Sequence, residues 1–193
     1  MFWTVFSFEL NYRLRRPATY IYFFTVLLLV TLIIANGGSP ASEKVHHNSP
    51  AMIGSFFSTM GILSILICSA VMGVPLYRDL EHNTKEYLLS SPIRKSAYFW
   101  GRFWGSFAIL VFICLGAIPG FVIGSWIGPL FDWTKPERYG PNHLVYYLWP
   151  FVTLLLPSLF FSSCLFFGLV SWFRNNRILY TVSIMLFILY LLS

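Results

Sequence analysis

The sequence YRDLEHNTKEYLLSSPIRK, residues 77–95, is a polar segment that separates two long apolar stretches. Together with Arg102, it holds eight of the chain's 20 charged side chains. The flanking stretches, Val45–Tyr77 and Phe103–Phe131, contain no Asp, Glu, Lys or Arg. Because a membrane helix needs about 20 apolar residues, this alternation predicts two membrane spans joined by a charged loop.

The composition extends this interpretation to the whole chain. Of the 193 residues, 57% are hydrophobic and 10% are charged, whereas soluble domains are about 25% charged. We therefore expect an all-α polytopic membrane protein whose helical bundle forms one transmembrane domain over residues 1–193. The expected spans are 19–35, 52–75, 97–126, 146–170 and 178–193. The last apolar run stops at Ser193, which predicts that the fifth span is cut short.

Basic residues predict the orientation, because Lys and Arg accumulate on the cytoplasmic side of a membrane protein. Ten of the 13 basic residues fall on one side of the expected spans, in the head, the polar segment and the short loop 171–177. The other side holds only Lys44, Lys135 and Arg138. We expect a cytoplasmic N-terminus, with the loops 36–50 and 129–143 facing outward.

The head, residues 1–16, mixes large aromatic residues with Glu9, Arg13, Arg15 and Arg16 before Pro17. Such a mixture is typical of an amphipathic helix that lies in the membrane interface. The alternative is a charged flank of the first span. The position of Pro17, which breaks a helix, favours an interfacial helix.

The polar segment itself has helical periodicity. Leu76, Leu80, Thr84 and Leu88 recur every four residues and share one face of a helix. Ser91 and Pro92 can end that helix and begin the next one, because serine caps helices and proline suits their first position. The pattern predicts a short cytoplasmic helix in the loop 76–96, and an ordered loop lying on the bilayer is the alternative.

Glycines form a second pattern. Gly116, Gly120, Gly124 and Gly128 recur every four residues, and Gly101 and Gly105 have the same spacing. Small residues at this spacing allow membrane helices to approach closely. The pattern predicts helix packing, either inside one bundle or against a partner subunit.

Sequence motifs for catalysis are weak. Glu43, His46 and His47 lie close together in an outward loop, but we expect no metal there, and no catalytic or cofactor-binding residue elsewhere. The chain lacks the Gly-x-x-x-x-Gly-Lys-Ser/Thr loop that binds nucleotide phosphates. The basic residues are explained by orientation and by anionic lipid, so no nucleic acid is expected.

The polar segment resembles the loop between the second and third spans of type-2 ABC exporter permeases. The matching pattern is Arg78-Asp79, Glu81, Thr84, Glu86, Leu88-Leu89, Pro92-Ile93 and Arg94, followed by Gly101-Arg102. The head resembles the interfacial helix of that family, which has six spans per domain. The chain is also similar to the permease half of bacterial proteins fused to a zinc aminopeptidase, although it has no His-Glu-x-x-His motif.

The resemblance implies a multi-pass permease of the inner (plasma) membrane. It would pair with a second permease domain and with a separate ABC ATPase subunit that binds ATP. The loop 76–96 would be a coupling helix docked on that ATPase. The implied docking residues are Arg78, Asp79, Leu80, Glu81, Thr84, Glu86, Leu88 and Pro92. The alternatives are a membrane anchor or assembly protein that transports nothing, and the permease region of a longer fusion with a peptidase domain.

Overall fold

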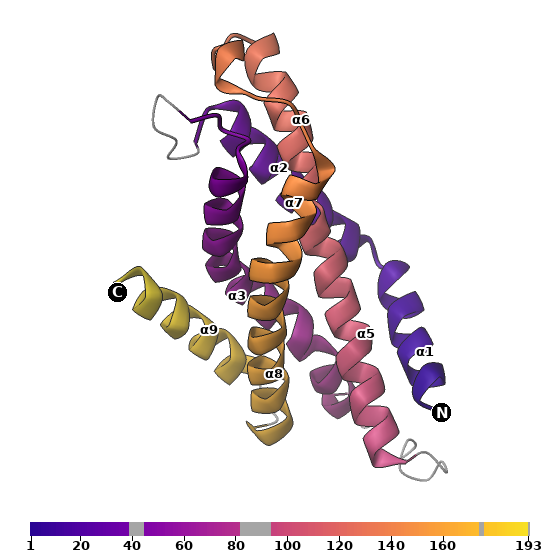
Figure 1. Ribbon diagram of the computed structural model, residues 1–193. Coiled ribbons are helices and arrows are strands. Elements are labelled where there is room, and N and C mark those ends of the chain that lie inside the picture. Colours follow the sequence, from indigo (N-terminus) through magenta and orange to yellow (C-terminus); the bar gives the residue numbers. More distant parts are fainter. Residues whose placement is uncertain (39–44, 82–93, 174–175, 193) are drawn as a thin grey trace. The chain divides into compact units, whose positions relative to one another are not determined.

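The computed structural model describes residues 1–38, 45–81, 94–173 and 176–192. Over these residues the chain forms helices and no β-strands (Figure 1). The expected all-α membrane class is confirmed. The elements are α1 (Phe2–Leu14), α2 (Pro17–Ala35), α3 (Pro50–Glu81), α5 (Lys95–Leu115), α6 (Ala117–Leu130), η1 (Pro136–Arg138), α7 (Leu144–Pro150), η2 (Phe151–Leu155), α8 (Leu156–Phe173) and α9 (Asn176–Leu191).

Four helical ranges among the described residues are long and apolar enough to cross a membrane. They are Pro17–Ala35, Pro50–Gly73, Lys95–Leu130 and Leu144–Phe173. The expected fifth span overlaps α9, which has 16 residues and is shorter than these four ranges. Large apolar side chains stay exposed along the helices, including Ile21, Phe24 and Leu28 of α2. Such a surface suits a hydrocarbon environment, in which apolar side chains need no cover.

The chain divides into two compact units. The first consists of Met1–Pro17, Ile62–Val111 and Leu159–Ser193. Its core includes a cluster of phenylalanines in which Phe103 of α5 lies edge-on to Phe167 of α8, with ring centroids 5.3 Å apart. Phe99 also contacts Phe167, at 4.9 Å. Within this unit α1 packs along α5 (Figure 1).

The second unit consists of Ala18–Gly61 and Phe112–Ser158. Its core contains Ile34 of α2, Phe57 of α3, Phe121 of α6 and Tyr147 of α7, all nearly inaccessible to solvent. The rings of Phe57 and Phe121 lie 5.8 Å apart, and those of Phe121 and Tyr147 lie 5.6 Å apart. Three helices are therefore joined by aromatic contacts around Phe121.

The expected third span, 97–126, is built from two helices rather than one. Helix α5 ends at Leu115, and Gly116 is the N-cap of α6. Pro119 explains the break, because proline has no N–H to donate to the carbonyl of Leu115 four residues earlier. The N–H of Gly116 instead donates to the carbonyl of Ile113 at 3.2 Å, which tightens the last turn of α5.

Candidate functional site

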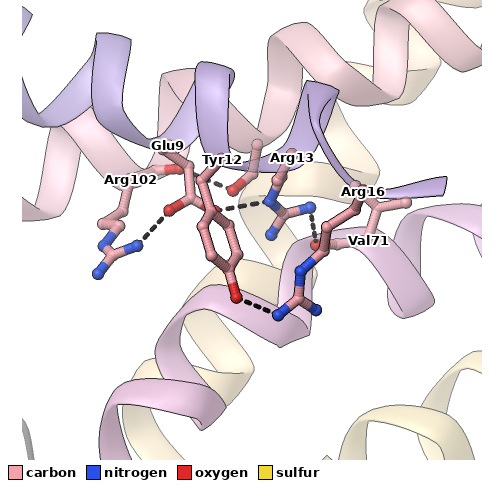
Figure 2. Close-up of polar contacts among 7 residues, drawn as sticks. Glu9, Tyr12, Arg13, Arg16, Val71 and Arg102 are labelled. Atoms are coloured by element: carbon pink, nitrogen blue, oxygen red, sulfur yellow. Dashed lines mark hydrogen bonds and ion pairs between the residues drawn. The ribbon is translucent and has the colours of Figure 1, made fainter. Parts of the chain in front are cut away.

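A buried cluster of three charged side chains is the most distinctive chemical feature of the first unit. Glu9 and Arg13 lie one turn apart on α1, and Arg102 lies on α5. The Nε of Arg13 donates to one carboxylate oxygen of Glu9 at 2.6 Å. A terminal nitrogen of Arg102 donates to the other oxygen (Figure 2). Glu9 is 0% exposed, Arg102 4% and Arg13 7%, so two guanidinium groups share one carboxylate away from solvent.

Two glycines of α5 allow α1 to approach α5 closely enough for these contacts. A Cβ at Gly105 would lie 2.8 Å from the Cβ of Glu9, and one at Gly101 would lie 2.8 Å from the Cβ of Val5. Real Cβ atoms do not come so close, so a larger residue at either position would push α1 away from α5. The spacing of Gly101 and Gly105 therefore places α1 where Glu9 reaches Arg102.

The charges in the cluster keep Glu9 ionised. Burial alone raises the pKa of a carboxyl group, but Arg13 and Arg102 outweigh this effect and hold the pKa of Glu9 below its usual value. Removing either partner from a buried ion pair is costly, since a charge is left without compensation. The cluster therefore ties α1 to α5 strongly as long as all three groups are present.

Arg13 also reaches a third helix. Its Nη1 donates to the backbone carbonyl of Val71 on α3 at 2.9 Å (Figure 2). Val71 is itself buried. Helix α1 is thus joined by polar side chains to both α3 and α5, the two helices between which the polar segment of the chain lies.

A second polar network lies in the second unit, before the start of α3. The side-chain amide of Asn48 donates to the carbonyl of Gly140 at 2.6 Å and accepts from its N–H at 2.7 Å. It also donates to the side chain of Asn142 at 2.9 Å. Asn142 in turn donates to Ser125 of α6 and accepts from the hydroxyl of Tyr147 of α7. These bonds fasten residues 140–142, in the loop between α6 and α7, to α6, to α7 and to the segment that precedes α3.

The same loop closes the end of α2. The last carbonyls of a helix have no partner inside it. Here Tyr139 donates to the carbonyl of Ile34 at 2.6 Å, and Thr134 donates to that of Ala35 at 2.8 Å. The loop between α6 and α7 is thus held in place by its hydrogen bonds to the last carbonyl groups of α2.

His47 is buried beneath this loop. Its backbone N–H donates to the carbonyl of Arg138 at 2.9 Å, and its ring lies 5.5 Å from that of Tyr139. Burial, together with the nearby charge of Arg138, lowers the pKa of His47. His46 is exposed, and Glu43 lies outside the described residues. No group of three metal-ligating side chains occurs among the residues that the structure describes.

The residues expected to dock on an ATPase lie at the end of α3 and beyond it. Arg78, Asp79, Leu80 and Glu81 belong to the last turns of α3. Thr84, Glu86, Leu88 and Pro92 lie outside the described residues, as does most of the expected coupling helix. The docking role of all eight residues stays a prediction.

The six glycines singled out in the sequence are placed in two groups. Gly101 and Gly105 contact α1, as described above. The other four contact neighbouring segments of the second unit, mainly the backbone of α2: a Cβ on any of them would lie 2.8–2.9 Å from a carbonyl oxygen there. The four are Gly116, Gly120, Gly124 and Gly128. These contacts are made within one chain.

Sequence reasoning missed the charged cluster and the loop network. It placed Glu9 and Arg13 in a helix that lies in the interface and counted Arg102 with the charges of the polar segment. A local signal existed for two of the three residues, because Glu9 and Arg13 have the spacing of a helical ion pair. Nothing local connects either residue to Arg102, which comes 93 positions after Glu9.

The helices define a multi-pass membrane protein. A family model described as ABC-2 family transporter protein matches residues 33–193. Since this range covers most of the chain, the chain belongs to the ABC-2 family of transporter proteins and is the membrane permease subunit of an ABC transporter. No curated protein and no solved structure compared with the chain matches it.

Proposed function

We propose that this permease is part of an exporter of the inner membrane and that it receives the energy of ATP through residues 76–96. A separate ABC ATPase subunit would bind and hydrolyse ATP, and a second permease domain, identical or different, would complete the pathway. The N-terminus and residues 76–96 would lie in the cytoplasm. The observation that carries the proposal is the concentration of charge between two membrane helices, α3 and α5.

The chemistry of the segment supports docking on a protein. Leu80, Thr84 and Leu88 share one helical face in the sequence pattern and could fill an apolar groove. Asp79, Glu81 and Glu86 could pair with basic residues on the rim of such a groove. Complementary charges of this kind fix the register of an interface more than they add affinity.

The arrangement of α1, α3 and α5 supports transmission of movement. Helix α3 ends at Glu81 and α5 begins at Lys95, so a displacement of the intervening residues acts on both helices. The cluster of Glu9, Arg13 and Arg102 links these helices to α1. Movement of the segment would then be passed to three helices of the first unit together.

A charge reversal tests the docking. In full-length protein co-expressed with the ATPase subunit, we expect Glu81→Lys with Glu86→Lys to abolish co-purification of the ATPase while the permease still inserts into the membrane. ATP hydrolysis would also no longer be linked to transport. The control, Asp132→Lys with Glu137→Lys, changes the net charge equally in the loop predicted to face outward and should retain the ATPase. Equal retention in both variants would contradict the proposal.

A further inference from the structure

Helix α3 contains a proline near its end, and this proline leaves one carbonyl group without its helical donor. In an α-helix each N–H donates to the carbonyl four residues earlier. Pro75 has no N–H, so the carbonyl of Val71 receives no bond from position 75. Helix α3 continues to Glu81. The gap in the bonding ladder therefore falls in the part of α3 that leads into the polar segment.

The guanidinium of Arg13 donates to that same carbonyl. The distance from Nη1 to the oxygen of Val71 is 2.9 Å, within the normal range of a hydrogen bond. Val71 is 4% exposed, so solvent has little access to the carbonyl. A donor from α1 thus replaces the backbone donor that Pro75 lacks.

The orientation of Arg13 is set by Glu9. The Nε of Arg13 is bonded to Glu9 at 2.6 Å, which leaves the terminal Nη1 directed to α3. Arg102 holds the second oxygen of Glu9. One guanidinium group, that of Arg13 or that of Arg102, would be enough to neutralise Glu9. The charge of Glu9 therefore does not explain why Arg13 also bonds to the carbonyl of Val71.

We propose that Arg13 is a positioning residue that braces α3 across Pro75. A proline inside a helix is a point at which the helix bends easily. The bond from Arg13 stiffens this point, so that residues 76–81 move with the rest of α3. That this brace serves coupling to an ATPase rests on the proposed function, whereas the brace itself does not.

The test uses hydrogen exchange of the backbone amides in residues 76–81, measured on the full-length protein in lipid nanodiscs. Arg13→Met keeps an unbranched side-chain stem and removes the guanidinium group with its donors. We expect it to speed exchange of these amides about tenfold, as the loss of a hydrogen bond from a charged group implies. Arg16→Met, on the neighbouring turn of the chain, is the control and should leave this exchange unchanged.

A second substitution makes the test specific. Pro75→Ala supplies an N–H that can donate to the carbonyl of Val71 and makes the bond from Arg13 dispensable. In that background, Arg13→Met should change the exchange of residues 76–81 by less than about twofold. Pro129→Ala, in α6, should give no such rescue. If Arg13→Met folds poorly, Arg13→Lys, which retains a charge for Glu9, is measured in the same two backgrounds.

The proposal is overturned if substitution of Arg13 leaves the exchange unchanged, or if it changes the exchange equally in the wild-type and Pro75→Ala backgrounds. Neither result depends on an ATPase. If the brace is found but the charge reversal at Glu81 and Glu86 has no effect on co-purification, the proposed docking fails and the brace stands. If the reverse is found, the brace fails and the docking stands.

Discussion

The carboxylate of Glu9 and the guanidinium of Arg102 form an ion pair across 93 positions of the sequence, and both side chains are buried. Each lies on a different helix, α1 and α5, so the pair determines where the N-terminal helix sits within the first unit. Arg13 extends the pair to α3. The cluster thus connects α1 to α3 and α5, the two helices that flank the polar segment.

Replacing Glu9 should destabilise the protein strongly. Glu9→Ala would remove the carboxylate that Arg13 and Arg102 share, and breaking a buried pair in this way costs about 3–5 kcal/mol. We expect a large fall in the temperature of unfolding of the detergent-purified protein. Glu137→Ala, which removes an exposed acid from η1, should change stability by less than about 0.5 kcal/mol. Similar unfolding temperatures for the two variants would contradict a structural role of the cluster.

A methyl group at Gly120 should weaken the packing of α6 on α2. Its Cβ would lie 2.8 Å from the carbonyl oxygen of Leu27, and backbone cannot move away as a side chain can. We expect Gly120→Ala to cost about 1–3 kcal/mol in thermal unfolding. Gly168 in α8 is the matched control, since nothing lies within 4 Å of its added Cβ. Gly168→Ala should leave stability unchanged or raise it, because alanine favours a helix; a loss equal to that of Gly120→Ala would be inconsistent with the packing described.

Asn48 should protect the loop between α6 and α7 from protease. Asn48→Ala removes the hydrogen bonds to the N–H and to the carbonyl of Gly140, and also the bond to Asn142. We expect trypsin to cleave after Arg138 about tenfold faster, because unsatisfied polar groups make the loop open more often. Asn36→Ala is the control, because the Asn36 side chain bonds only to its own helix at Leu32 among the contacts described. Unchanged cleavage in Asn48→Ala would show that the loop is held by other contacts.

His47 should make stability dependent on pH. Its pKa is lowered in the folded protein by burial and by Arg138, so the unfolded chain binds more protons below the ordinary pKa of about 6.5. Stability rises with pH wherever the unfolded state binds more protons. The contribution of His47 is therefore complete above about pH 6.5 and is lost as the pH falls below it.

The measurement is the unfolding temperature between about pH 7.5 and pH 5, a range above the ordinary pKa of Glu, about 4.3. Glu9, whose pKa is lowered further, stays ionised across this range. We expect His47→Gln to reduce the fall in stability on acidification and His46→Gln, at an exposed position, to leave it as it was. If the unfolding temperature fell equally with pH in the wild type and in His47→Gln, His47 would not be the origin of the pH dependence.

The sequence alone predicted the fold class, because runs without charge and of membrane length follow directly from composition. The stretch 97–126 was expected as one span, and the structure interrupts it at Gly116, three residues before Pro119. The spacing of the glycines indicated close packing of helices, but could not name α2 as the neighbour of Gly120. Which helices meet depends on contacts between distant parts of the chain, and periodicity holds no information about them.

The same limit applies to the site. The spacing of Glu9 and Arg13 is that of a helical ion pair, although no such pair was predicted, whereas Arg102 can be assigned to the pair only from the structure. The link from Arg13 to Val71 is hidden for another reason, since it depends on a backbone carbonyl that any residue at position 71 would present. In the sequence, only Pro75 indicates that this carbonyl lacks its helical donor, because Pro75 lies four positions later and has no N–H.

The most direct test of the central claim is site-specific photo-crosslinking of the complex that this permease forms with its ABC ATPase subunit. A benzoylphenylalanine placed at Thr84, in the segment proposed to dock, should cross-link to the ATPase on illumination. The same group at Trp133, in the loop predicted to face outward, should not. Cross-linking from Trp133, or its absence from Thr84 in a complex that contains the ATPase, would contradict coupling through residues 76–96.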